Sequence, residues 1–396
     1  MTRILVYQQK GKLRPAGGAS AVCYYYMKEQ ERRGDSYFEF LPDFTSFSKL
    51  HDNEKTRISK MPKWIQKSYS IFKQIVRLNI ILGGHYKTEP VDFSKYDIVH
   101  FHDTQNLYIR RKDLLSYKGV IILQSHEPCP LAKEIYDSLT PFVRFFIPFI
   151  KKRLETMDRF AFQRADYIIF PCPEAEEPYY NNWRFYKTIH ESKKESYRYV
   201  LTGIPASKPR ISREEIRRML CVPDQGFVVC YVGRHNIIKG YDSLKRIGSH
   251  LLSKADTWVV CAGKEYPLTG LDNSHWIEIG WTTDAHSYIS GSDVFLLPNK
   301  ETYFDIVMLE VLSLGKVVVA RRTGGNKYFE KMGCKGVFLY DTEEEALSIL
   351  EELKMLSKEE LSSLGQQNKA FFEKHHTVEV MYDNYINTLK ELHTIL

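Results

Sequence analysis

Two stretches of the chain decide its fold: residues 227–240, FVVCYVGRHNIIKG, and residues 293–316, DVFLLPNKETYFDIVMLEVLSLGK. Each opens with a short apolar run that predicts a strand buried on both faces, and each run stops at glycine or proline. Between Tyr231 and Asn326 such runs alternate with segments of helical periodicity, the pattern of an open parallel sheet. Because such sheets bind ligands at the carboxyl ends of their strands, the polar residues after these runs form the candidate site.

Two cations follow the first run. Gly233 permits a sharp turn after the strand Val228–Val232, and Arg234 and Lys239 come next. A guanidinium can bind two phosphate oxygens at once, while an ammonium adds a compact point charge, so the pair suits a diphosphate. The alternative is a pair of solvated surface cations. The order of elements, in which a strand is followed by Gly-Arg and then by a loop that ends in Lys-Gly, favours the phosphate interpretation.

The second run is followed by a polar loop and a helix. The loop covers 299–304, the helix is predicted to start near Asp305, and Glu310 falls more than one turn inside it. A buried carboxylate without a partner costs several kcal/mol, so Glu310 needs donors nearby. These could belong to a structural ion pair or be two ribose hydroxyls. The helix start also offers free N–H groups to an anion.

From Tyr231 to Gly325 this order of residues resembles the donor half of the retaining, nucleotide-sugar-dependent glycosyltransferases of family four, or group 1. The resemblance implies an α/β protein with two Rossmann-like domains that face each other across a cleft, the GT-B fold. It also implies that Arg234 and Lys239 act catalytically by holding the donor pyrophosphate next to Gly233, and that Glu310 binds the ribose. The residues implied to meet the donor sugar are Glu301, Thr302, Tyr303, Phe304 and Asp305.

The loop departs from the family pattern, which has Glu-x-Phe-Gly followed by a second Glu. Phe304 and Glu310 keep the register, but Thr302 stands at the first Glu and Asp305 at the Gly, while Glu301 lies one residue early. Either Glu301 turns in, or Thr302 and Asp305 bind the sugar hydroxyls. The identity of the sugar is therefore left open.

The 396 residues suit two domains. We place an acceptor-binding domain at 1–203 and a nucleotide-sugar-binding domain at 204–375; by resemblance, a helix at 376–396 crosses back onto the first domain. Near the N-terminus, Gly17 and Gly18 lie between a predicted strand and a predicted helix, where backbone N–H groups could approach an anion. The resemblance places this loop opposite the donor phosphate; an ordinary turn is the alternative.

His126 follows the predicted strand Val120–Leu123. The resemblance places a catalytic histidine here, near the donor sugar and the acceptor. The alternative is a structural histidine with satisfied hydrogen bonds.

Two basic, aromatic stretches lie in the first domain, at 49–87 and 140–152. Such stretches can lie in the interface of an anionic membrane. The alternative is a helix packed on its own domain with a solvated basic face.

Composition excludes several classes of protein. No apolar run is long enough to span a bilayer, and the seven scattered cysteines contain no CxxC pair, so we expect a reducing cytosol and no structural zinc. The net charge of +7 comes without a nucleic-acid-binding motif. No Asp-x-Asp motif occurs, so we expect no metal and no cofactor.

Together these observations predict a metal-independent retaining hexosyltransferase. It would move a hexose or N-acetylhexosamine from a nucleotide-diphosphate sugar, a UDP-sugar, to a saccharide or lipid-linked saccharide in the synthesis of a bacterial capsule, surface polysaccharide or glycoconjugate. The enzyme would be cytoplasmic and peripheral on the inner face of the membrane. Two alternatives remain: a non-catalytic transferase-like subunit, and a two-Rossmann sugar-nucleotide epimerase, which would form product without an acceptor.

Overall fold

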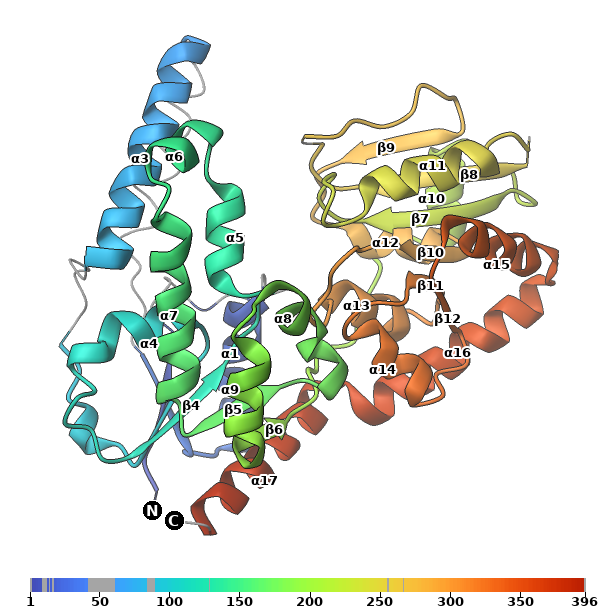
Figure 1. Ribbon diagram of the computed structural model, residues 1–396. Helices are drawn as coiled ribbons and strands as arrows, with labels where there is room; N and C mark the ends of the chain where they lie inside the picture. Colours follow the sequence, from blue (N-terminus) through green and yellow to red (C-terminus); the bar gives the residue numbers. More distant parts are fainter. Residues whose placement is uncertain are drawn as a thin grey trace. The chain divides into compact units, whose positions relative to one another are not determined.

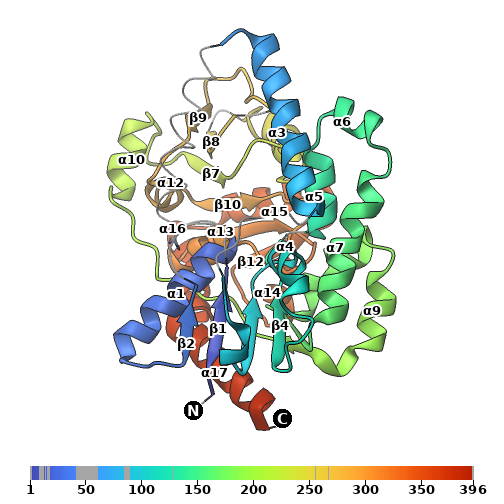
Figure 2. The same ribbon diagram turned by 90° about the vertical axis from the view of Figure 1, so that its left-hand side faces the viewer.

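The computed structural model describes residues 2–8, 13, 15, 18–41, 61–83, 90–127, 129–254, 256–265 and 267–394 (Figures 1 and 2). The chain divides into two compact units. The first comprises 1–170 and 179–199, and the second comprises 171–178 and 200–396.

The first unit contains, in chain order, β1 (Ile4–Tyr7), α1 (Gly18–Arg33), β2 (Phe38–Phe40), α3 (Lys63–Gly83), the 3-10 helix η1 (Phe93–Lys95), β3 (Ile98–Phe101), α4 (Thr104–Ile109), η2 (Arg110–Lys112), β4 (Val120–Gln124), α5 (Leu131–Ser138), α6 (Pro141–Phe146), α7 (Ile150–Arg164), β5 (Tyr167–Phe170), α9 (Tyr186–Ser192), η4 (Lys194–Ser196) and β6 (Tyr197–Tyr199). Its described strands form a sheet of order β2-β1-β3-β4-β5-β6. All neighbours pair in parallel; Val99, for example, lies between Leu5 and Ile121.

The second unit contains η3 (Pro173–Glu176), α10 (Arg213–Met219), β7 (Phe227–Val232), α11 (Tyr241–Leu251), β8 (Thr257–Ala262), β9 (Trp276–Gly280), α12 (Ala285–Gly291), β10 (Val294–Leu297), α13 (Ile306–Ser313), β11 (Val317–Arg321), α14 (Asn326–Lys331), β12 (Val337–Tyr340), α15 (Glu343–Met355), α16 (Lys358–His375) and α17 (Val378–Thr394). The helix α8 (Glu177–Asn182) begins in the second unit and ends in the first. The described strands form a parallel sheet of order β12-β11-β10-β7-β8-β9.

Alternation along β7 explains how this second sheet is covered. Val229 and Tyr231 join one buried cluster with side chains of α11 and α15, such as Leu244 and Leu350. Val228 points to the other face, where it clusters with side chains that precede the sheet or lie on α12. Because both faces of the sheet are covered, β7 needs an apolar side chain at every position. This explains the continuous apolar run in its sequence.

The predicted α/β architecture with two Rossmann-like parallel sheets is confirmed. Strands predicted at 228–232 and 120–125 correspond to β7 and β4, and the helix predicted near Asp305 is α13. The domain bounds 1–203, 204–375 and 376–396 stay predictions. The observed units differ in detail, because 171–178 and 200–203 group with the second unit, as does α17.

Some expectations fall outside the described residues or need correction. Gly17 and residues 49–60 and 84–87 are outside the described part. The polar composition of residues 181–198 predicts a surface excursion, which is wrong: the segment includes α9 and buries Trp183, Tyr186 and Ile189. Within the described ranges, no helix is both long enough and apolar enough to cross a membrane.

Candidate functional site

The loops after β7 and β10 meet because these strands are neighbours in the second sheet. The backbone N–H of Lys300 donates to the carbonyl of Ile238 at 2.9 Å. Gly240 has φ +67°, and a Cβ placed there would lie 1.8 Å from the Pro298 carbonyl oxygen. Glycine is therefore required at 240 for the two loops to approach, and Lys239 is brought to the loop of Asp305.

Lys239 and Asp305 form an ion pair at this edge. The ammonium lies 2.5 Å from Oδ2 of Asp305, and the Asn299 side-chain amide donates to the same oxygen at 2.5 Å. Burial alone would raise the pKa of Asp305, but the charge and hydrogen bond of Lys239 hold it below its ordinary value. Asp305, which departs from the family pattern, is thus ionised. It pairs with Lys239, the cation that the resemblance assigns to the donor phosphate.

Arg234 lies at the same strand end and is exposed. Among the described residues, its guanidinium forms no hydrogen bond, whereas its backbone carbonyl accepts from the Tyr231 hydroxyl at 2.9 Å. Burial raises the pKa of Tyr231; Asp305 raises it further and Arg234 lowers it. Arg234 and Lys239 thus both lie in the turn between β7 and α11.

Glu310 on α13 is half-buried and pairs with His286 on α12. His286 Nε2 lies 3.4 Å from Glu310 Oε1, and the two side chains are 33% and 28% exposed. The hydrogen bond to Glu310 raises the pKa of His286 above its ordinary value. The partner that the sequence argument required for Glu310 is thus a histidine 24 positions earlier, and both side chains remain open to a ligand.

The loop before α13 is anchored in the core. The side chains of Thr302, Tyr303 and Phe304 are buried, and Glu301 is half-buried. The Phe304 ring lies 5.9 Å from that of Tyr328, centroid to centroid. Of the residues expected to meet a donor sugar, Phe304 therefore fixes the loop in the core.

In the first unit, His126 lies beside the start of α1. A Cβ placed on Gly18 would be 3.7 Å from the Cβ of His126, so the predicted glycine and histidine come together. His126 Nε2 lies 2.9 Å from Nδ1 of the buried His102. Burial lowers the pKa of His126 to about 3, so it is neutral at physiological pH.

The bond between these two histidines has a favoured direction. His102 Nε2 is buried and has no hydrogen-bond partner in the described part of the chain. A buried acceptor without a partner is tolerated better than a buried N–H without one. We therefore assign the donated proton to His102 Nδ1, which leaves the single proton of His126 on Nδ1 as a hydrogen-bond donor.

Comparison with known proteins shows what the second unit resembles. Residues 226–356 match the model of the family described as "Glycosyl transferases group 1". This part of the second unit is therefore similar to the group 1 glycosyl transferases. The D-inositol 3-phosphate glycosyltransferase of Salinispora arenicola is 31% identical over 144 residues, which are 31% of this chain and 32% of that protein. The chain thus aligns with about a third of the length of this curated relative.

Solved structures extend the likeness to both units. A structure of Anabaena Alr3699/HepE in complex with UDP has 13% identity and a TM-score of 0.62 over 99% of this chain and 100% of that one. Sucrose-phosphate synthase from Thermosynechococcus elongatus has 13% identity and a TM-score of 0.66 over 100% of each chain. WaaG, described as a glycosyltransferase involved in lipopolysaccharide biosynthesis, has 13% identity and a TM-score of 0.57 over 96% and 98%. The fold is GT-B, as expected.

Next to the Arg234 turn, the second unit contains a polar cluster that sequence analysis missed. His235 is fully buried and stacks on Tyr241, with ring centroids 3.9 Å apart. Glu278 accepts hydrogen bonds from the Tyr241 hydroxyl and from Trp276 Nε1. Burial lowers the pKa of His235. The turn that contains Arg234 therefore packs on a neutral imidazole, which lies beside the carboxylate of Glu278.

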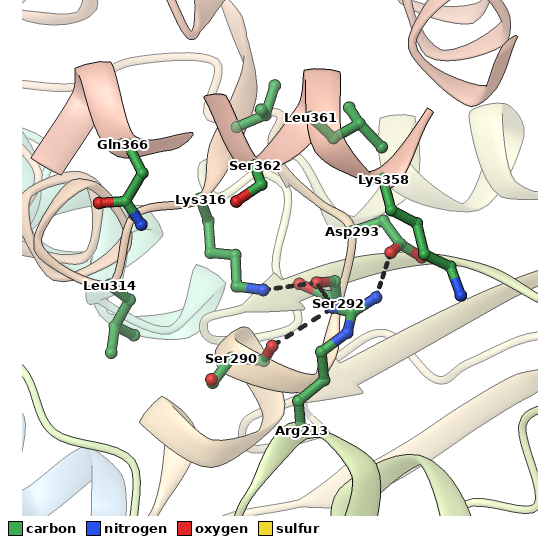
Figure 3. Close-up of a pocket in the computed structure, with 12 residues that line it drawn as sticks. Arg213, Ser290, Ser292, Asp293, Leu314, Lys316, Lys358, Leu361, Ser362 and Gln366 are labelled. Carbon is green, nitrogen blue, oxygen red and sulfur yellow. Dashed lines mark hydrogen bonds and ion pairs between the residues drawn. The ribbon is translucent and has the colours of Figure 1, made fainter. Parts of the chain in front are cut away.

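A cavity of about 260 Å³ lies at the opposite edge of the second sheet, before β10 and β11 (Figure 3). Its cations have partners: Arg213 lies 2.5 Å from Asp293, and the Lys316 ammonium donates to the Ser292 carbonyl at 2.9 Å. Burial and the nearby Arg213 lower the pKa of Lys316 to about 8. We interpret this network as a structural link between α10 and the sheet.

Metal ligands were not expected from the sequence. Among the described residues, no group of three or more His, Cys, Asp or Glu side chains is placed to hold a metal ion.

Proposed function

We propose that the protein is a glycosyltransferase that moves a sugar from a nucleotide-diphosphate sugar to a saccharide acceptor. The observation that carries this proposal is the position of Arg234 and Lys239 at the carboxyl end of β7, inside the region that is similar to the group 1 glycosyl transferases. Structures of Anabaena Alr3699/HepE with UDP and UDP-glucose support a uridine nucleotide as the donor. The sugar is a hexose or N-acetylhexosamine.

The acceptor is a lipid-linked saccharide in the assembly of a bacterial surface polysaccharide such as a capsule, or of a glycoconjugate. The enzyme then works in the cytoplasm, at the inner face of the membrane. The basic, aromatic helices of the first unit support this part of the proposal.

The donor diphosphate replaces Asp305 as the partner of Lys239. In the free protein, Asp305 neutralises Lys239, while Arg234 carries a charge without a protein partner among the described residues. A diphosphate between the two cations receives bidentate hydrogen bonds from Arg234 and a point charge from Lys239. Asp305 is then released to accept a hydrogen bond from a sugar hydroxyl, which gives this departure from the family a role in sugar selection.

The same cations stabilise the departing diphosphate, so the reaction needs no metal. Each well-placed donor that meets charge developing in the transition state is worth about 3 kcal/mol. The configuration at the anomeric carbon is retained. Glu310 accepts hydrogen bonds from ribose hydroxyls, and His126 offers its Nδ1 proton to a sugar hydroxyl without becoming charged.

The test combines nucleotide calorimetry with donor hydrolysis and transfer assays. We expect UDP to bind and a UDP-sugar to be consumed, with Lys239→Ala and Glu310→Ala abolishing transfer while circular dichroism shows an intact fold. Unchanged turnover in both variants would overturn the site. Nucleotide binding without turnover would indicate a non-catalytic subunit, and a new sugar nucleotide formed without acceptor would indicate an epimerase.

A further inference from the structure

The cavity at the amino ends of β10 and β11 contains an excess of positive charge. Its cationic side chains come from three different elements: Arg213 from α10, Lys316 from the position before β11, and Lys358 from the start of α16 (Figure 3). Among the described residues that line the cavity, the acid is Asp293. Three cations around one carboxylate leave two positive charges in excess.

The carboxylate of Asp293 is already shared. It lies 2.5 Å from Arg213 and 3.3 Å from Arg217, so one acid faces two guanidinium groups. In the described part of the chain Lys316 forms no ion pair, and its ammonium donates to the Ser292 carbonyl. A carbonyl oxygen accepts a hydrogen bond but carries no formal charge. These contacts therefore hold the cations in place without neutralising them.

A buried cation without a counter-ion is costly, and this cost is visible at Lys316. Burial, and then the charge of Arg213, lower the pKa of Lys316 to about 8. An anion in the cavity would reduce both the desolvation of the ammonium and its repulsion from Arg213, because it would supply the negative charge that the lining lacks.

The cavity has room and polar groups for such an anion. Its volume of about 260 Å³ is far above the roughly 15 Å³ that a single water needs. Ser362 and Gln366 of α16 also line it, and among the described residues neither side chain has a hydrogen-bond partner. A hydroxyl and an amide N–H can therefore donate to an oxyanion beside the ammonium of Lys358.

We propose that this cavity binds a phosphate group, carried by inorganic phosphate or by a small phosphomonoester. The cations Arg213, Lys316 and Lys358 neutralise its charge, while the hydroxyl and amide groups of α16 donate to its oxygens. Two positive charges in excess match a phosphate dianion better than a carboxylate. The site is separate from the candidate donor site, which lies at the carboxyl ends of the same strands.

The test is isothermal titration calorimetry of the full chain with inorganic phosphate, with glucose 6-phosphate and with glucose. We expect both phosphates to bind and neutral glucose not to bind. Tighter binding of inorganic phosphate would identify the free ion as the ligand, and tighter binding of glucose 6-phosphate would identify a phosphomonoester. Lys316→Met and Lys358→Ala should each weaken phosphate binding roughly tenfold.

The variants differ in their risk to the fold, and a control is available on the same helix. Lys358 is exposed and forms no ion pair among the described residues, so Lys358→Ala should fold normally. The matched control is Lys374→Ala, because Lys374 is also an exposed lysine of α16 but does not line the cavity. It should bind phosphate like the unmodified chain.

The pH dependence of binding gives a readout that a purely structural role of Lys316 would not produce. Sulfate is the probe, because its charge stays constant above neutral pH. Sulfate binding should weaken as pH rises through about 8, where Lys316 loses its proton, and Lys316→Met should remove this dependence. Burial raises the pKa of Cys230 to about 12, so this neighbour stays protonated. The charged or titratable groups that face Lys316 are Arg213, Arg217, Glu214, Cys230, Asp293 and Lys358.

The candidate donor site is the rival location for phosphate, and Lys239→Ala separates the two. Binding that is kept in Lys239→Ala and weakened in Lys316→Met supports the cavity, whether or not the protein transfers a sugar. Binding that is weakened in Lys239→Ala but unchanged in Lys316→Met and Lys358→Ala would overturn the proposal. So would equal weakening in Lys374→Ala, which would indicate general attraction by surface charge, or no binding of phosphate and sulfate by the unmodified chain.

Discussion

The Lys239–Asp305 pair distinguishes this site from the family pattern, which has glycine where Asp305 stands. A ligand phosphate must compete with this carboxylate for the lysine. Asp305→Asn should therefore tighten UDP binding several-fold, because Lys239 loses its competing anion. Binding of the correct UDP-sugar should improve less or weaken, because the sugar loses an acceptor. Isothermal titration calorimetry measures both affinities.

The control for that variant is Asp256→Asn. Asp256 also forms an ion pair with a lysine, Lys354, at 2.5 Å. It immediately precedes β8, so it lies at the amino ends of the strands, away from the ends that carry Lys239 and Asp305. The control should leave both affinities unchanged. Weaker UDP binding in Asp305→Asn would show that the carboxylate supports phosphate binding and would contradict the competition described here.

The His286–Glu310 pair predicts a pH dependence. The pKa of His286 is raised in the folded protein, so its stabilising contribution is fully present below the unfolded pKa near 6.5 and is lost as pH rises through the folded pKa. Both groups are about a third exposed, so we expect less than about 1 kcal/mol. The difference in unfolding free energy between the unmodified chain and His286→Gln should be present at pH 5.5 and vanish by pH 9. A difference in unfolding free energy that stays constant between pH 5.5 and pH 9 would contradict this role of the His286–Glu310 pair.

The sequence could single out Arg234, Lys239 and Glu310 as candidates because each stands at a fixed distance from a strand end or helix start. It did not indicate His286 as the partner of Glu310, Asn299 as a donor to Asp305, or His102 as the partner of His126. His286 reaches Glu310 only because α12 packs beside α13, and His102 reaches His126 only because β3 pairs with β4. The local sequence pattern can indicate residues at the ends of strands and helices. It cannot indicate contacts between elements that become neighbours only in the folded sheet.

Among the secondary structure elements, long apolar runs were predicted well and short edge strands were not. The strands β2 and β6 are three residues each and lie at the two edges of the first sheet. Such short segments carry too little periodicity to be recognised. In 181–198 the buried aromatic residues alternate with charged ones, so that the segment had the composition of a surface loop.

The turn between β7 and α11 provides a prediction about backbone geometry. Gly240→Ala should destabilise the second unit by well over the roughly 1–2 kcal/mol of a left-handed residue, because its Cβ would meet the Pro298 carbonyl at 1.8 Å. It should also abolish UDP binding by separating the loops of Lys239 and Asp305. Denaturant unfolding and calorimetry measure the two effects.

The matched control for that turn is Gly280→Ala. Gly280 has φ +72°, but nothing lies within 4 Å of the added Cβ. The Gly280→Ala variant should lose only the stability that a left-handed backbone costs a residue with a Cβ, and it should still bind UDP. Equal effects of the two substitutions would mean that close approach of the two loops is not what requires Gly240.

For the whole molecule, two parallel sheets divide the work that we propose. The second unit holds the cations and the acid for a nucleotide diphosphate, and the first holds His126. The parallel sheet of the second unit was expected from the alternation of strands and helices, and the second sheet from the chain length and the family resemblance. The contact between α3 and α6 was not expected, because it depends on a hydrogen bond between residues 66 positions apart.

The central claim is that Arg234 and Lys239 hold the diphosphate of the donor, and calorimetry of Arg234→Met tests it most directly. Arg234 is exposed and has no side-chain partner among the described residues, so its loss should not affect folding. We predict that UDP affinity falls at least tenfold, or about 1.4 kcal/mol, while the weak binding of uridine is unchanged. The control Arg218→Met, an exposed arginine on α10, should bind UDP normally. UDP affinity unchanged in Arg234→Met would contradict the account.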